Sequence, residues 1–217
     1  GLCEGAREGL MVVDTSTSEP ASTNRIREDL ARAGVTYIDA PLARTPKEAE
    51  EGRLNIMVGA ADADYARLRP VLAAFCENIF HVGPPGAGHV VKLLNNFLAM
   101  AIATSTAEAF AACAKAGVPA ANLHAVVSAA GVNSGIFQAM YKAFAGDFTG
   151  LKFALDNARK DLRYYTHFTE GLPTASLLGE AVHQSFVLAC NQGYGGKFIA
   201  SLIEVQEKLN DVRILPR

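Results

Sequence analysis

The fold is decided by the stretch Gly83-Pro-Pro-Gly-Ala-Gly-His-Val-Val-Lys-Leu-Leu-Asn-Asn96, which opens a helix that we expect to run to about Ala116. From Val90 to Ala103 the side chains are apolar on every face of this helix, a pattern typical of a helix buried in a protein or a membrane. The apolar run is too short to cross a bilayer, and polar residues follow it. We therefore expect a core helix and no membrane partner.

Lys92 interrupts this apolar run and is the only charged side chain of the helix before Glu108. Burial of an ammonium group costs several kcal/mol unless the group is paired or loses its proton. Asn96 follows one turn later on the same face, so an amine with a lowered pKa would stand beside an amide that donates and accepts hydrogen bonds. This pair suits proton transfer to or from a hydroxyl or carbonyl group. The alternative is a lysine whose stem is buried and whose amine reaches solvent from the helix end.

The composition bounds the class of protein. The chain has 217 residues, of which half are apolar and 19% are charged, and its net charge is −2. This balance argues against a nucleic-acid or anionic-membrane surface. The histidines have no metal-ligand spacing, so we expect no metal site. No Cys-x-x-Cys pair occurs and no signal segment opens the chain, so we expect a cytoplasmic protein with reduced cysteines at positions 3, 76, 113 and 190.

The order of the predicted elements divides the chain in two. Strands are expected at 11–13, 36–38, 54–58 and 78–82, with helices at 18–33, 47–51 and 62–75 between them. This alternation is the signature of an α/β layer. After Gly88 only helices are expected, at 88–116, 119–130, 134–145, 151–169, 174–192 and 198–209. The interpretation is an α/β domain over residues 1–84 followed by an all-helical domain over residues 85–217, with the central helix at their junction.

Six motifs follow one another along nearly the whole chain: Asp14-Thr-Ser-Thr-Ser-Glu-Pro20, Asp39-Ala-Pro41, Gly52-x-Leu-x-Ile-Met-Val-Gly59, Gly83-Pro-x-Gly-x-Gly88, Lys92-x-x-Asn-Asn96 and Lys160-Asp-Leu162. Each is weak alone, but together and in this order they resemble the β-hydroxyacid dehydrogenase family, which includes 3-hydroxyisobutyrate dehydrogenase and is related to 6-phosphogluconate dehydrogenase. The resemblance implies a Rossmann-type domain, NAD or NADP as cofactor and a small anionic hydroxy acid or its semialdehyde as substrate. It also implies a homodimer or homotetramer built on the helical part.

The resemblance assigns roles to individual residues. Lys92 matches the catalytic lysine, and Asn96 matches the asparagine that orients the substrate. Lys160 matches the lysine that reaches the cofactor, while Ser16 and Thr17 lie where the family approaches the nicotinamide. The residues alone also allow other roles. The hydroxyls of Ser16 and Thr17 could cap the following helix, and Lys160 could lie on a solvent-exposed helix face.

The chain departs from the family pattern at two places. The G-x-G-x-x-G turn that holds the cofactor pyrophosphate is absent from the sequence, so we expect the chain to begin late in the dinucleotide-binding domain and to bind cofactor weakly. The substrate loop, usually Ser-Gly-Gly, is here Ala43-Arg44-Thr45, which is similar to the sulfolactaldehyde reductase branch. An arginine fork binds carboxylate, sulfonate or phosphate oxygens, which points to a strongly anionic substrate. The alternative is a surface arginine in a charged loop.

Two other functions remain open at this stage. The first is a non-catalytic helical fragment that dimerises or binds a partner, which the missing glycine motif favours. The second is 6-phosphogluconate oxidation, although the short helical region and the Arg-Thr loop favour a smaller substrate. By the resemblance, the residue that selects between NAD and NADP lies in the segment that is missing together with the glycine motif, so we expect either cofactor.

Overall fold

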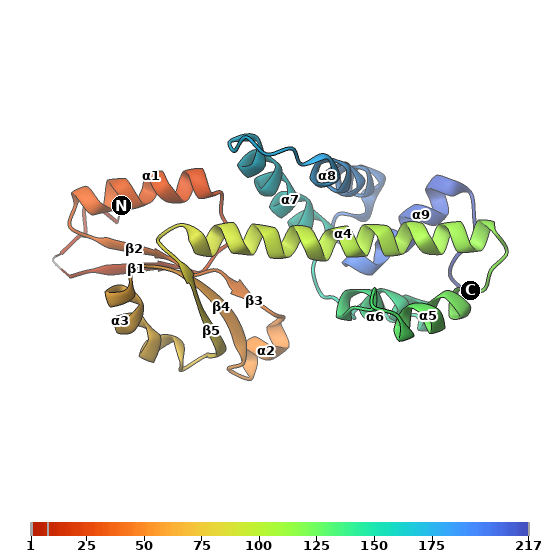
Figure 1. Cartoon of the computed structure of the whole chain (residues 1–217), viewed down its shortest axis with the longest axis horizontal. Helices are drawn as coiled ribbons and strands as arrows, with labels where there is room; N and C mark the ends of the chain where they lie inside the picture. Colours follow the sequence, from red (N-terminus) through yellow and green to blue (C-terminus); the bar gives the residue numbers. More distant parts are fainter. Residues whose placement is uncertain (1, 8, 217) are drawn as a thin grey trace. The chain divides into compact units, whose positions relative to one another are not determined.

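The computed structural model describes residues 2–7 and 9–216, which are drawn as a ribbon in Figure 1. The chain divides into two compact units. Unit 1 comprises Gly1–Asn95 and His167–Thr174, and unit 2 comprises Asn96–Thr166 and Ala175–Arg217. Helix α4 (Ala87–Lys115) begins in unit 1 and ends in unit 2. The boundary near residue 84 stays a prediction, because α4 itself belongs to both units.

Unit 1 is built on a mixed sheet of five strands: β1 (Met11–Asp14), β2 (Thr36–Asp39), β3 (Leu42–Ala43), β4 (Leu54–Gly59) and β5 (Cys76–Gly83). Strands β1 and β2 run parallel, as do β4 and β5. Strand β3 pairs with β4 antiparallel, and β2 joins β4 at the pair Asp39–Gly59. The four predicted strands are therefore confirmed, and only the two-residue β3 was not predicted.

Helices cover both faces of this sheet (Figure 1). On β2, Tyr37 packs with Leu30 of α1 (Pro20–Arg32), whereas the next residue, Ile38, packs with Leu68 and Leu72 of α3 (Asp62–Leu72). Neighbouring side chains of a strand point to opposite faces, so this split assigns α1 and α3 to different sides. The short α2 (Pro46–Glu50) precedes β4.

The start of α4 is fitted closely to the sheet by glycine. A Cβ atom on Gly88 would lie 2.6 Å from the carbonyl oxygens of Asp39 and Met57, and one on Gly59 would lie 2.7 Å from the Gly88 nitrogen. Real Cβ atoms do not approach so closely, so only glycine allows this contact. Gly86 has φ = 99° and makes the turn into the helix.

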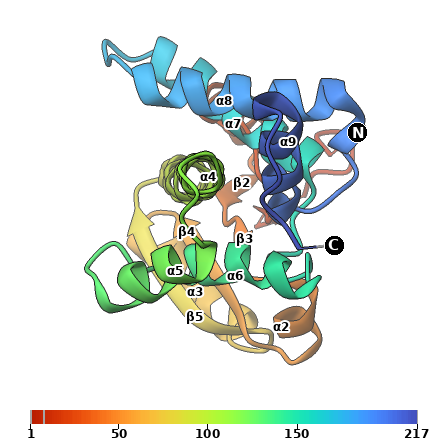
Figure 2. The ribbon, with the colours of Figure 1, turned by 90° about the vertical axis from the view of Figure 1, so that its right-hand side faces the viewer.

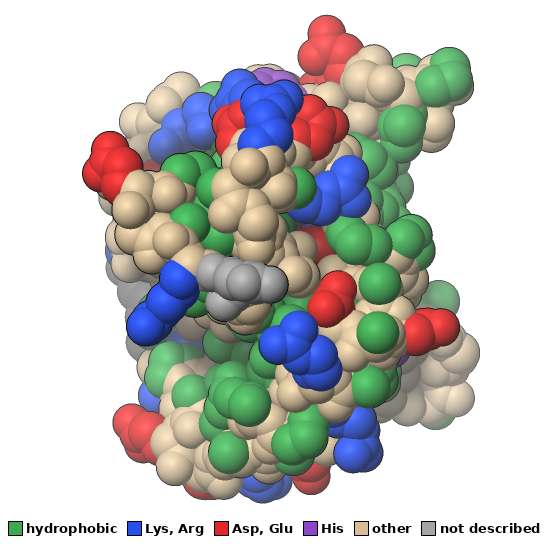
Figure 3. All heavy atoms as spheres, turned by 90° about the vertical axis from the view of Figure 1, so that its left-hand side faces the viewer, with side chains coloured by type: hydrophobic (Ala, Val, Ile, Leu, Met, Phe, Trp, Pro, Cys, Tyr) green, Lys and Arg blue, Asp and Glu red, His purple; other side chains and the backbone are tan. Residues whose placement is uncertain are grey.

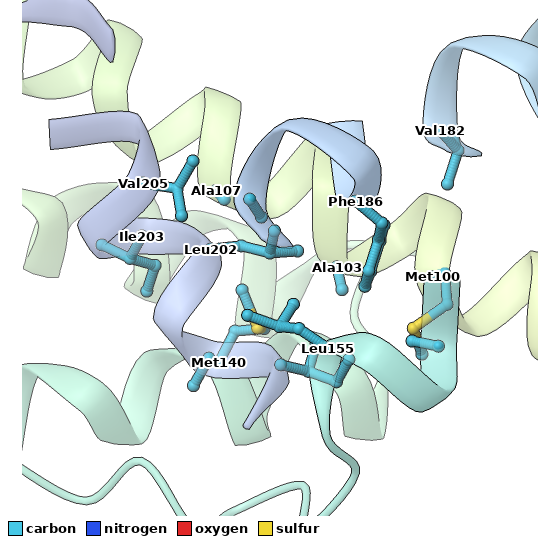
Figure 4. Packing of buried hydrophobic residues seen from close by; sticks show 14 of the residues in the cluster. Met100, Ala103, Ala107, Met140, Leu155, Val182, Phe186, Leu202, Ile203 and Val205 are labelled. Carbon is cyan, nitrogen blue, oxygen red and sulfur yellow. The ribbon is translucent and has the colours of Figure 1, made fainter. Parts of the chain in front are cut away.

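Unit 2 is all helical and contains the rest of α4 together with the following segments: α5 (Ala120–Ala129), α6 (Gly135–Tyr141), the 3₁₀ turns Lys142–Ala145 and Ile199–Ser201, most of α7 (Leu155–Glu170), α8 (Leu177–Ala189), the π turn Cys190–Tyr194 and α9 (Leu202–Asn210). Viewed along α4, α5 and α6 lie on one side of it and α7 and α8 on another (Figure 2). Their apolar side chains meet in one core, in which Phe186 and Leu155 are completely buried (Figure 4).

The predicted helices of unit 2 are confirmed, with two shifted starts: α8 begins at Leu177 rather than near 174, and α7 begins at Leu155 rather than near 151. The residues before it are held by an isolated bridge between Ala154 and Phe198, so a tertiary contact replaces the first predicted turn.

The expectation that α4 is buried on every face is wrong for one stripe. Leu94 and Leu98 are 40% and 60% exposed. The whole helix has 29 residues and is long and apolar enough to cross a bilayer, so the length argument drawn from residues 90–103 does not by itself exclude a membrane. The core helix of a soluble protein passes the same test, and Met100, Ala103, Ala107 and Phe110 of this helix are buried in the unit 2 core.

Candidate active site

The segment that follows β1 presents the predicted hydroxyls at the carboxyl end of the sheet. The Asp14 carboxylate accepts hydrogen bonds from the Ser16 backbone N–H at 2.9 Å and from the Tyr37 hydroxyl at 2.6 Å. Burial raises the pKa of Asp14, but these hydrogen bonds outweigh burial and hold the pKa below its ordinary value. Asp14 thus stays ionised and orders the turn. Ser16 is exposed and Thr17 is half-buried, so neither is a core residue.

His89, in the first turn of α4, is completely buried against this segment. Its Nδ1 lies 2.6 Å from the Thr23 hydroxyl, and its Nε2 lies 3.2 Å from the Ser16 carbonyl oxygen. Burial lowers the pKa of His89, although the nearby carboxylates of Asp39 and Asp14 oppose this effect. His89 is thus a hydrogen-bonded histidine at a helix start, and its partners lie in the segment that carries Ser16 and the helix that follows it.

Asp39, at the end of β2, closes the amino end of α4. It is fully buried, and its carboxylate accepts the backbone N–H of Gly86 at 2.6 Å and that of His89 at 2.9 Å. The first N–H groups of a helix have no partner within the helix, and a carboxylate there is also favoured by the helix dipole. Asp39 therefore fixes the turn of α4 that precedes Lys92.

Lys92 is half-buried, less sequestered than the sequence predicts. It lies in unit 1, in the second turn of α4, whereas Asn96 is the first residue of unit 2. The two positions are four residues apart in one unbroken helix and therefore share a face.

Asn96 is 8% exposed, and its Nδ2 donates a 2.7 Å hydrogen bond to Oδ2 of Asp161 on α7. Asp161 is itself 4% exposed, and Nζ of Lys160 lies 3.1 Å from its other oxygen. A buried carboxylate that accepts from an amide fixes which end of the amide faces away from it. Asp161 thus joins the two motifs that contain Asn96 and Lys160.

Asp161 was not predicted as a site residue, although the sequence carries a signal for it. It lies three residues after Ala158 and four before Tyr165, which are both buried, so it lies on the apolar face of α7. A carboxylate on such a face needs a partner. Its neighbour Lys160 is 41% exposed, and a hollow of about 110 Å³ lies beside it, lined by Arg159, Lys160, Arg163 and His183.

The three residues of the predicted substrate loop all have local structural partners. Ala43 pairs with Asn55 in the sheet. Arg44 has φ = 84°, and its guanidinium donates to the Glu77 carboxylate and to the Arg53 carbonyl oxygen. The backbone N–H and hydroxyl of Thr45 donate to Glu48 in the first turn of α2. Their role toward substrate stays a prediction.

Comparisons with known proteins show what the two parts of the chain are similar to. The NAD-binding domain family of 6-phosphogluconate dehydrogenase matches residues 1–83, and the NAD-binding family of NADP-dependent 3-hydroxyisobutyrate dehydrogenase matches residues 86–205. The chain is 32% identical over 217 residues to 2-(hydroxymethyl)glutarate dehydrogenase of Eubacterium barkeri, covering 99% of this chain and 71% of that protein. The chain belongs to the β-hydroxyacid dehydrogenase family.

Two further relatives bear on this family assignment. The 3-sulfolactaldehyde reductase of Escherichia coli (strain K12) is 29% identical, over 94% of this chain and 69% of that protein. The crystal structure of a 3-hydroxyisobutyrate dehydrogenase from Salmonella typhimurium superposes with a TM-score of 0.80 at 30% identity, covering 94% of this chain and 72% of that one. The predicted fold class, oxidoreductase class and NAD or NADP cofactor are therefore confirmed at the level of the family.

The carboxyl edge of the sheet fits one end of such a cofactor. Strands β1 and β2 run parallel and end together at Asp14 and Asp39. Ligands of doubly wound sheets bind outside this edge, and the exposed hydroxyl of Ser16 lies there. Among residues 2–7 and 9–216, no three His, Cys, Asp or Glu side chains gather as a metal site.

Proposed function

We propose that this protein is an oxidoreductase acting on the hydroxyl carbon of a small anionic β-hydroxy acid or, in reverse, on its semialdehyde. The observation that carries the proposal is the polar face of α4, on which a half-buried lysine precedes by one turn an asparagine held by a buried carboxylate. The match of the helical part to a 3-hydroxyisobutyrate dehydrogenase family favours this substrate class over 6-phosphogluconate.

Lys92 takes the hydroxyl proton in oxidation and returns it in reduction. A lysine must lose its own proton before it acts as a base, and partial burial and the positive amino end of a helix both favour the neutral amine. Lys92 meets both conditions, because it lies in the second turn of α4 and is half-buried.

Asn96 holds the reacting oxygen or the substrate tail. Because one N–H of its amide is bound to Asp161, the amide is oriented before substrate arrives. A group held in place in advance loses little entropy when it binds, which lowers the barrier of the chemical step.

Ser16, Thr17 and Lys160 are the proposed contacts to NAD or NADP, whose nicotinamide supplies the carbon that accepts or gives the hydride. The exposed position of Ser16 at the carboxyl edge and the half-exposed amine of Lys160 support these roles.

Arg44, with its neighbours Ala43 and Thr45, is proposed to bind the anionic group of the substrate. The relatives include enzymes named for a glutarate, which is a dicarboxylate, and for a sulfonated aldehyde. Arg44 would exchange its partly exposed partner Glu77 for the substrate oxygens, at little cost, since exposed ion pairs contribute about 0–1 kcal/mol.

A homodimer or homotetramer in the cytoplasm completes the proposal. The exposed stripe of Leu94 and Leu98 on α4 supports an association with a second copy, because association would remove this apolar surface from water.

The face of the molecule drawn in Figure 3 mixes basic and acidic side chains, in keeping with the net charge of −2.

The test is the Lys92→Ala variant of the full-length gene product, assayed by NAD(P)H absorbance with carboxylated and sulfonated three-carbon substrates. Loss of proton transfer should lower kcat by roughly 10²- to 10⁴-fold. The matched control is Lys115→Ala, which removes an exposed lysine from the last turn of the same helix and should leave kcat unchanged. A Lys92→Ala variant with near-normal kcat would contradict the assigned role.

A further inference from the structure

His89 is a buried side chain of α4 that contacts the segment carrying Ser16, three residues before Lys92. It is completely buried, and each of its ring nitrogens faces one polar atom of the sequence region 16–23. We infer that His89 is a positioning residue that, in its neutral Nε2–H form, locks residues 15–19 onto the first turn of α4. The inference rests on the proposed function, in which Ser16 contacts the cofactor and Lys92 transfers the proton.

The hydrogen-bond partners determine which nitrogen of His89 carries the proton. The Ser16 carbonyl oxygen can only accept, so Nε2 must donate to it. In the neutral ring Nδ1 then has a lone pair and accepts from the Thr23 hydroxyl at 2.6 Å. The same hydroxyl also lies 3.1 Å from the Glu19 carbonyl oxygen, but that oxygen already accepts the Thr23 backbone N–H at 3.0 Å, and the shorter 2.6 Å contact assigns the hydroxyl proton to Nδ1. Every donor in this cluster is therefore matched with an acceptor.

The surrounding carboxylates are already occupied. Asp39 accepts two backbone N–H groups, and Asp14 accepts the Ser16 N–H and the Tyr37 hydroxyl. The nearest approach of His89 to Asp14 is 4.0 Å, too long for a hydrogen bond. The ring is thus held by Ser16 and Thr23 rather than by an ion pair.

This arrangement sets the spacing between the proposed catalytic lysine and a proposed cofactor contact. Lys92 follows His89 by three residues in the same helix, and Ser16 is bound to the ring of His89 through its carbonyl oxygen. Any slip of residues 15–19 along α4 would break this bond to a ring that is itself completely buried. The Ser16 hydroxyl is therefore carried in a constant relation to the turn that bears Lys92.

Two substitutions separate the hydrogen bonds from the bulk of the ring. In His89→Gln the amide can donate to the Ser16 carbonyl oxygen and accept from Thr23, so the lock is kept. In His89→Leu both bonds are lost while an apolar side chain fills the space. The control is His81→Leu on β5, because His81 also bonds a backbone carbonyl oxygen, that of Ala60 at 2.7 Å, but far along the chain from residues 15–19.

Three readouts are compared in the full-length protein. Amide hydrogen exchange of residues 15–19 should become about tenfold faster in His89→Leu and stay unchanged in His89→Gln and His81→Leu, since a lost hydrogen bond of ordinary strength corresponds to roughly this factor. The KM for the cofactor should rise about tenfold in His89→Leu alone, by the same reasoning. A nitrogen-15 spectrum of the wild type should report His89 with its proton on Nε2.

Equal exchange of residues 15–19 in wild type and His89→Leu would overturn the inference, as would a proton on Nδ1. Equal losses in His89→Leu and His81→Leu would also overturn it, because they would indicate a general loss of stability. The amide hydrogen exchange and the tautomer of His89 are measured without catalysis. They therefore test the role of His89 even if the Lys92→Ala variant shows that the proposed function is wrong.

Discussion

Removal of the charge on Asp161 tests whether a buried carboxylate orients the proposed substrate amide. Asp161→Asn keeps the size of the side chain and can still offer a carbonyl oxygen to Asn96, but it replaces a charged acceptor with a neutral one. Hydrogen bonds to charged groups contribute about 1.5–3 kcal/mol and neutral ones about 0.5–1.5 kcal/mol. The difference of about 1–1.5 kcal/mol predicts a roughly tenfold lower kcat/KM.

Asp161→Leu is the more severe change, because it leaves the Asn96 N–H without its acceptor in a position that is only 8% exposed. An unsatisfied buried donor costs about 1–3 kcal/mol, which should appear in the free energy of unfolding by urea. The kcat/KM should fall further than in Asp161→Asn, since the amide of Asn96 then loses its hydrogen bond to residue 161 altogether.

The assay measures kcat/KM for both variants, for Asn96→Ala and for the double variant Asn96→Ala/Asp161→Asn. Effects that act through one bond are not additive, so the double variant should be no worse than Asn96→Ala alone. Asp156→Asn is the control on the same helix, because Asp156 is 55% exposed and lies 3.5 Å from Arg159. Wild-type kcat/KM in both Asp161 variants, or fully additive losses in the cycle, would refute the reasoning.

Three further predictions concern the substrate loop, the buried histidine and the core. Arg44→Ala should raise the KM for sulfonated or dicarboxylated substrates about tenfold, and unchanged KM values would remove Arg44 from the site. The same variant should change the free energy of unfolding by less than about 1 kcal/mol, since the ion pair of Arg44 with Glu77 is partly exposed. The pKa of His89 is lowered in the folded protein, so the unfolded state binds an extra proton between pH 6.5 and that lower value. Stability contributed by His89 is therefore full above pH 6.5 and declines as pH falls below it, by up to about 1.4 kcal/mol per pH unit; urea curves at pH 7.5 and 5.5 should show a smaller decline in His89→Gln, and equal declines would contradict this. Phe186→Ala should lower the free energy of unfolding by about 3–5 kcal/mol because Phe186 is fully buried. Leu177→Ala, at an 86% exposed position, should change the free energy of unfolding by less than about 0.5 kcal/mol. Similar losses in the two variants would mean that the core is misassigned.

The regular elements could be predicted because local patterns decide them. Short apolar runs predicted β1, β2, β4 and β5, and Gly34 follows the first helix in the left-handed conformation that glycine commonly adopts there. Strand β3 was not predicted because two residues are too few to show an alternation of apolar and polar side chains. Its pairing also depends on β4, which comes later in the chain. The start of α7 was misplaced for the same reason, since Phe198 holds the preceding residue.

The candidate site was only partly predictable, because its polar contacts join distant residues. Lys92 and Asn96 could be identified, since a charge and an amide in an apolar helix are visible in the sequence. The bond from Asn96 to Asp161 spans 65 positions, and neither partner reveals the other. The exposure of Leu94 and Leu98 could not be predicted either, since an apolar pattern alone does not tell whether a helix face packs within its own chain.

The cap that Asp39 places on α4 has a consequence for the order in which the protein assembles. The acceptor precedes the capped N–H groups by 47 and 50 positions, so the helix cannot close its own beginning. The chain between Asp39 and the start of α4 must therefore fold back on itself before these hydrogen bonds form. Closing this loop has an entropic cost, which we expect the formed sheet to offset. The turn that leads to Lys92 should consequently be among the last parts of the helix to become protected during refolding, after β2 and β4 have joined.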